Sequence, residues 1–156
     1  MGLTSILMKD SRAGFSLIEL LVVFAIMAVI ATFAIIGLKD YSRYQQYDAS
    51  VASVKSTFID TRVRARSAEL DQSYGVKIFT NSLVVFRGST YSAGASTNKT
   101  VTLTGVTLSR SLAGGTDQIV FNKLTGMPSA TGTVTIVGTT HVATTTLTIT
   151  GAGVIQ

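Results

Sequence analysis

The chain has 156 residues, of which 46% are hydrophobic, with a formal net charge of +5 and no cysteine. This length allows one long helix and one small globular domain, but not two globular domains. The lack of cysteine excludes disulfide bonds, structural zinc sites built on cysteine, and thiol catalysis.

The first predicted element is a long apolar segment near the N-terminus, GFSLIELLVVFAIMAVIATFAIIGL. Its last 19 residues, 20–38, carry no charge. As a helix they would span roughly 28 Å, close to the thickness of the hydrocarbon core of a bilayer. Residues 15–38 are therefore predicted to form a transmembrane helix. Lys9 and Arg12 precede it, so the N-terminus is expected in the cytoplasm and the C-terminal domain on the other side of the membrane.

Glu19 places a carboxylate inside this apolar helix. An acid at the centre of a membrane helix costs about 3 kcal/mol on insertion scales, and less near the interface. The segment offers no lysine or arginine between Arg12 and Lys39. A cation that pairs with Glu19 must therefore come from a new N-terminus or from another chain.

The stretch Gly14–Val23, GFSLIELLVV, resembles the class III leader of type IV pilins and type II secretion pseudopilins. The resemblance implies that a prepilin peptidase and N-methyltransferase removes residues 1–14 and methylates the new amine of Phe15. It also implies that Glu19 pairs with the Phe15 ammonium of a neighbouring subunit as a filament is built. A secretory signal peptide and an unprocessed signal anchor are the alternatives, and the mature N-terminus distinguishes them.

The helical pattern continues beyond the apolar span, over residues 39–71. Residues at spacings of three and four form one apolar face of a helix: Tyr44, Tyr47, Val51, Val54, Phe58, Thr61, Ala65 and Ala68. The first proline in the chain is Pro128, so nothing obliges this helix to break before about Leu70. A helix over 15–67 would be roughly 80 Å long.

Arg62, Arg64 and Arg66 form a tight basic cluster at the end of this helix. Arg62 and Arg66 share a helix face, and Arg64 points about 200° away from Arg62. One interpretation is a solvated helix end whose cations favour the C-terminal dipole. The other is a basic contact with DNA or with an acidic subunit.

From Gln72 onward β-branched residues alternate with polar ones, which predicts a β-rich globular domain over 72–156. Residues 74–80 and 83–87 are expected to form a hairpin. Further strands are expected at 100–103, 106–108, 118–122, 133–137, 142–150 and 154–155, between glycine-containing turns.

This half of the chain is similar to the H-type minor pseudopilins of type II secretion and to the T-type fimbrial minor pilins. The similarity rests on segments such as YGVKI (74–78), IVFN (119–122) and GMP (126–128), and on the basic helix end at 62–68. It implies a pilin-like α+β fold, in which the long N-terminal helix packs on an antiparallel β-sheet domain. It also implies a minor pseudopilin near the filament tip. The alternatives are a minor or major subunit of a type IV pilus for adhesion, motility or DNA uptake, and a DNA-binding receptor.

Residues suited to catalysis or metal binding are sparse. The chain has one histidine, His141, and after Asp71 it has one acid, Asp117. Neither a catalytic triad nor a calcium site is therefore expected. Five basic residues oppose Asp117 after Gln72, and their scatter favours a solvated surface over a nucleic-acid site. We expect the chain to have no enzymatic activity and to bind neither a cofactor nor a metal.

Overall fold

The computed structural model describes residues 14–139 and 142–156, except for the side chains of residues 34–38. The chain divides into two compact units, Met1–Lys39 and Asp40–Gln156. Helix α1 (Leu17–Arg66) contributes residues to both units.

In the first unit, α1 begins at Leu17 and carries Glu19 in its first turn. An acid there complements the positive end of the helix dipole. The apolar side chains that follow are exposed; Phe24 and Phe33, for example, are 61% and 71% accessible. A continuous apolar surface of this kind marks a site of interaction with protein or membrane.

Across the described residues, no stretch of helix is both long enough and apolar enough to cross a membrane. The predicted transmembrane helix covers 15–38, and the side chains of 34–38 lie outside the described set. Residues 1–13, which include Lys9 and Arg12 of the predicted leader, also lie outside it. The membrane span and its orientation stay predictions.

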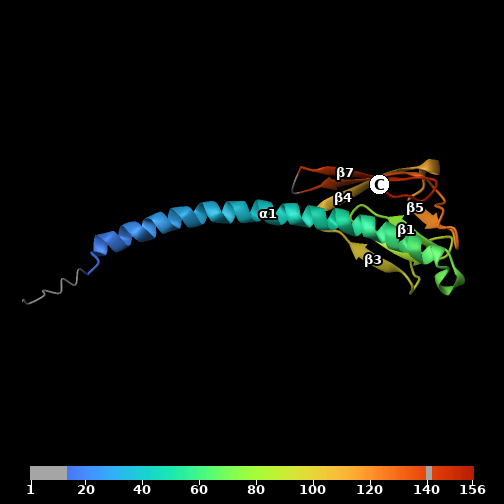
Figure 1. Ribbon diagram of the computed structural model, residues 1–156, viewed down its shortest axis with the longest axis horizontal. Helices are drawn as coiled ribbons and strands as arrows, with labels where there is room; N and C mark the ends of the chain where they lie inside the picture. Colours follow the sequence, from blue (N-terminus) through green and yellow to red (C-terminus); the bar gives the residue numbers. More distant parts are fainter. Residues whose placement is uncertain (1–13, 140–141) are drawn as a thin grey trace, which may run out of the picture. The chain divides into compact units, whose positions relative to one another are not determined.

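The second unit combines residues 40–66 of α1 with two antiparallel sheets (Figure 1). A four-stranded sheet has the order β3-β2-β1-β5, and a three-stranded sheet has the order β4-β6-β7. The strands are β1 (Tyr74–Ile78), β2 (Ser82–Arg87), β3 (Lys99–Thr102), β4 (Val106–Leu112), β5 (Gln118–Phe121), β6 (Gly132–Gly138) and β7 (Thr144–Ile149). Short 3₁₀ turns occupy Glu69–Asp71 and Ala113–Gly115. The predicted α+β class, with an N-terminal helix and antiparallel strands, is confirmed.

The predicted hairpin is present, with Val76 opposite Val85 in the β1–β2 pairing. Its turn closes where the Phe79 N–H donates to the Ser82 carbonyl at 2.9 Å. Each of the other expected strands also appears; β4 continues four residues beyond its expected end at Leu108, and the other ends shift by two residues or fewer. The last of them is reduced to a single bridge between Ile149 and Ile155.

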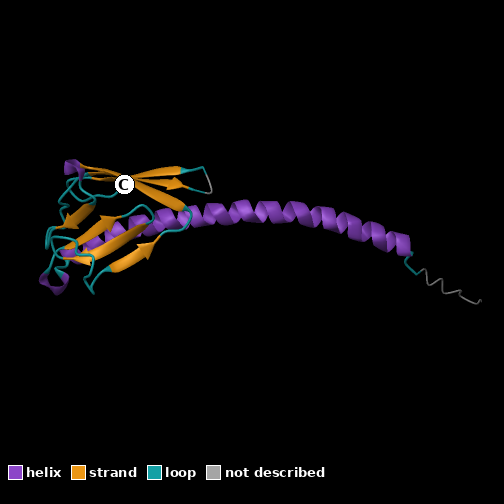
Figure 2. Cartoon of the chain, turned by 180° about the vertical axis from the view of Figure 1, so that it is seen from behind, coloured by secondary structure: helices purple, strands orange, loops and turns teal. Residues whose placement is uncertain are grey.

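Residues 40–66 of α1 and the two sheets enclose one hydrophobic core (Figure 2). The helix residues buried in it recur at spacings of three and four, as predicted: Tyr47, Ser50, Val54, Thr57, Phe58, Thr61 and Ala65. Tyr44 is 52% exposed, so the buried stripe begins one turn later than predicted. The buried hydroxyls are satisfied locally, since Thr61 donates to the Thr57 carbonyl at 2.7 Å.

Helix α1 ends where the backbone turns into the left-handed region. Ala68, Leu70 and Asp71 have φ values of 50°, 53° and 58°, which residues other than glycine rarely adopt. The Ala65 carbonyl accepts one hydrogen bond from the Ala68 N–H at 3.1 Å and another from the Leu124 N–H at 2.9 Å, so a loop distant in sequence helps to cap the last turn. Neither glycine nor proline marks this end.

Replacing Phe58 with alanine is expected to lower the free energy of unfolding by about 3–5 kcal/mol, because it leaves a cavity in the core. Phe58 is fully buried between the helix and the sheets. Its neighbour Ile59 is 43% exposed, and Ile59→Ala should cost less than about 1 kcal/mol. Urea unfolding of both full-length variants in detergent micelles measures the difference. Equal losses would show that Phe58 does not anchor the core.

Candidate processing and assembly site

Gly14 and Phe15 lie just before α1, where residues 14–16 carry no secondary structure and are exposed. A Cβ added to Gly14 would meet no atom within 4 Å. Exposed backbone outside a helix is the kind of segment that proteases cut. The bond between Gly14 and Phe15 is therefore open to a peptidase.

Glu19 lies four residues after Phe15, in the first turn of α1, and is exposed. Among the described residues, no ion pair includes Glu19. A carboxylate in apolar surroundings is stable only beside a counter-charge. The geometry therefore leaves Glu19 available to a cation from a second chain.

An apolar hollow lies farther along the same helix, within the first unit. The residues that line it follow the spacing of three and four of one helix face: Val22, Ala25, Ile26, Val29 and Ile30. A face of this kind, with the small Ala25 near its middle, suits the packing of another helix.

The three arginines at the end of α1 have different surroundings. Arg62 donates to the carbonyls of Gly126 at 3.3 Å and Ala152 at 2.7 Å. The stem of Arg66 also packs against Gly126, so closely that a Cβ there would clash with it. The predicted shared face of Arg62 and Arg66 is thus confirmed, and it holds the loop after β5 and the C-terminal segment.

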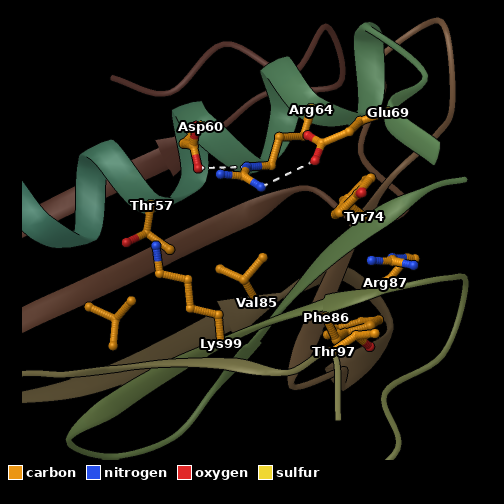
Figure 3. A pocket seen from close by; sticks show the side chains of 11 residues that line it. Thr57, Asp60, Arg64, Glu69, Tyr74, Val85, Phe86, Arg87, Thr97 and Lys99 are labelled. Atoms are coloured by element: carbon orange, nitrogen blue, oxygen red, sulfur yellow. Dashed lines mark hydrogen bonds and ion pairs between the residues drawn. The ribbon is translucent and has the colours of Figure 1, made fainter. Parts of the chain in front are cut away.

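Arg64 lies on the other side of the helix, between two carboxylates (Figure 3). Its guanidinium pairs with Asp60 at 2.9 Å and with Glu69 at 3.5 Å. The hydrogen bond and charge of Asp60 raise the pKa of Arg64 above its usual value. Arg62 and Arg64 thus have partners inside the chain, and a contact of the three arginines with DNA or an acidic subunit stays a prediction.

The segment that carries Gly14, Phe15 and Glu19 matches the family model of the prokaryotic N-terminal methylation motif over residues 9–35. The fold matches two crystal structures of the type IV minor pilin FimU from Pseudomonas aeruginosa, with TM-scores of 0.54 and 0.56. The sequence identities are 14% and 13%; the matches cover 70% and 74% of this chain, and 90% of each FimU chain. No curated protein sequence matches the chain.

The chain thus carries the prokaryotic N-terminal methylation motif and has the fold of a type IV minor pilin. The motif and the fold each support, independently, the resemblance to type IV pilins and pseudopilins drawn from Gly14–Val23. In this pilin-like chain, the motif implies processing by a peptidase and assembly with other pilin subunits.

A charge cluster that sequence reasoning missed joins the two sheets of the pilin-like domain. Lys77 on β1 pairs with Asp117 at 2.6 Å, and Arg110 on β4 approaches the same carboxylate at 3.9 Å. The hydrogen bond from Lys77 is the main reason why the pKa of Asp117 lies below its usual value. Lys77 stands far from Arg110 and Asp117 in the chain, and no local pattern links the three. Among the described residues, no three acidic, histidine or cysteine side chains converge as a metal site would need, and His141 lies outside those residues.

Replacing Lys77 with methionine is expected to flatten the pH dependence of stability. The pKa of Asp117 is lower in the folded state than in the unfolded state. Its ionised form therefore stabilises the fold fully above the unfolded-state pKa of about 3.9, and this stabilisation is lost as the pH falls through the folded-state pKa. Asp117 is 40% exposed, so the loss at neutral pH should stay below about 1 kcal/mol. Melting temperatures between pH 2 and pH 7 measure this.

Lys123→Met is the matched control, because its partner Asp71 is 87% exposed and solvent screens that pair. Parallel melting curves for the wild type and Lys77→Met would contradict the expected role of Lys77.

Proposed function

We propose that this pilin-like chain is a minor structural subunit of a bacterial filament, cut after Gly14 and N-methylated at Phe15. The observation that carries the proposal is the methylation motif at the head of an exposed apolar helix that holds one carboxylate, Glu19. In this function the chain is the substrate of an enzyme and catalyses no reaction itself.

Before assembly, residues 15–38 anchor the subunit in the inner membrane, and residues 72–156 lie on its outer side as the globular domain. During assembly, the Glu19 carboxylate neutralises the Phe15 ammonium of a neighbouring subunit. The apolar hollow along Val22–Ile30 packs against a neighbouring helix. Both contacts give the exposed helix a partner of matching chemistry.

For the machine that uses the filament, we favour the type II secretion pseudopilus, with this subunit near the tip. The similarity of residues 74–78, 119–122 and 126–128 to H-type minor pseudopilins supports this assignment. The second candidate is a type IV pilus for adhesion, motility or DNA uptake, and the likeness in fold to the minor pilin FimU favours it. A DNA-binding receptor ranks third, because Arg62 and Arg64 already bind groups within the chain.

A clean deletion of the gene in the source organism tests these assignments. Loss of secreted proteins with surface pili retained would support type II secretion. Normal secretion with loss of pili or DNA uptake would assign the subunit to a type IV pilus. If none of these traits changes, the proposed filament function is wrong.

A further inference from the structure

A small cavity lies between α1 and one edge of the four-stranded sheet, within the second unit (Figure 3). Its volume is about 120 Å³. A water molecule takes about 30 Å³ in the liquid, so the cavity has room for a group of a few heavy atoms. The charged side chains that line it are Asp60, Arg64, Glu69, Arg87 and Lys99.

The two acids at this cavity are both held by one arginine. Arg64 pairs with Asp60 and with Glu69 on the helix side. Across from them, Arg87 and Lys99 form no ion pair among the described residues. The formal charges of the five side chains sum to +1, which one monovalent anion would neutralise.

Arg87 adds an independent observation, which is a buried hydrogen-bond donor without a partner in the described part of the chain. Its Nε is buried and has no hydrogen-bond partner among the described residues. A buried donor on a charged group is costly to leave unpaired, and such groups in native structures normally have a partner. The unpaired donor belongs to a residue that lines the cavity.

The register of the sheet brings the two cations to the same side. Val85 pairs with Lys99 across β2 and β3. Alternate residues of a strand face the same way, so Arg87, two residues after Val85, projects to the side on which Lys99 lies. Because β3 is an edge strand, a partner can reach the cavity without opening the sheet.

We propose that this cavity binds a carboxylate, and that Arg87 and Lys99 receive there an aspartate or glutamate side chain of a neighbouring subunit. This inference rests on the proposed filament function, since it names the chemistry of one subunit contact. The planar guanidinium of Arg87 suits a carboxylate, which it can bind through two parallel hydrogen bonds. Lys99 supplies a second positive charge on a flexible stem.

Titration of the full-length chain in detergent micelles with acetate tests the chemistry of the site. The Arg87 Nε–H resonance in ¹⁵N spectra should shift and saturate, whereas sodium chloride at equal ionic strength should not move it. Arg87→Gln should weaken acetate binding about tenfold or more, the usual effect of losing a charge-assisted hydrogen bond. Arg110→Gln is the matched control, because Arg110 lies outside the cavity lining and faces Asp117, and it should bind acetate as the wild type does. Equal shifts with chloride, or unchanged binding by Arg87→Gln, would overturn the site.

Incorporation into filaments tests where the carboxylate comes from. Arg87→Gln should reduce the share of subunit in sheared filaments about tenfold relative to Arg110→Gln, with Arg87→Lys between them. Thermal melting of each variant shows whether its fold is retained. Acetate binding that depends on Arg87, together with normal incorporation of Arg87→Gln, would overturn the subunit source and leave a site for a free carboxylate. If the wild type itself never enters filaments, the proposed function fails, and the acetate titration still decides the site.

Discussion

Valine in place of Gly14 is expected to leave the chain uncut, so that the precursor accumulates in place of a mature protein that begins at Phe15. A β-branched side chain next to the scissile bond adds bulk and restricts the backbone that the peptidase must accommodate. Extra carbon atoms in a fitted enzyme pocket change rates by about 10–200-fold. Cleavage should therefore fall by about 100-fold.

The structure makes this loss attributable to the peptidase. A Cβ at Gly14 would meet no atom within 4 Å, so the substitution does not disturb packing in the described chain. Gly94→Val is the matched control, since Gly94 also has open space around it and lies far from the proposed cleavage point. Immunoblots and the intact mass of the purified protein measure the fraction cut. A mature chain from Gly14→Val that still begins at Phe15 would refute the proposed scissile bond.

Periodic elements of the fold were predictable from the sequence because their signals are local. The spacing of three and four from Tyr47 to Ala65 predicted the buried face of α1, and alternation of β-branched residues predicted the β1–β2 hairpin. The division of the strands into two sheets was not predictable in this way. It depends on pairings such as Val106 with Gly138, which join distant segments through the core.

The same difference between local and long-range signals applies to the functional residues. Gly14, Phe15 and Glu19 stand within one short motif, so the sequence predicts their roles together, although those roles stay predictions. Arg87 and Lys99 come together only through the register of β2 and β3. Their positions in sequence look like those of two scattered surface cations.

The end of α1 shows why the boundaries of an element were harder to predict than the element itself. The helix ends at Arg66 without a glycine or proline signal, because Ala68 adopts a left-handed conformation and Leu124 caps the Ala65 carbonyl. The contact of Leu124 is tertiary, and the left-handed conformation falls on an alanine, which does not mark a turn in the sequence. A prediction that relies on helix-breaking residues such as glycine and proline therefore extended the helical segment to residue 71.

Replacing Glu19 with glutamine is expected to leave cleavage and methylation intact but to reduce incorporation into filaments by about 100-fold or more. Glutamine keeps the shape of the side chain and removes the charge. The Phe15 ammonium of the neighbouring subunit would then be buried without a counter-charge, at a cost of about 3–5 kcal/mol. Each 1.4 kcal/mol is a factor of ten in an equilibrium. The measured quantity is the share of processed subunit recovered in sheared filaments.

Two further variants separate the ion pair from effects on the helix itself. Loss of Glu19 from the first turn of α1 removes a dipole interaction of only about 0.3–1 kcal/mol, which is too small to abolish assembly. Asp48→Asn removes another exposed helical carboxylate and should assemble normally. Glu19→Asp keeps the charge at shorter reach, so it should recover part of the loss. Because the two Glu19 variants differ in charge, equal incorporation by both would show that the carboxylate does not pair with the new N-terminus.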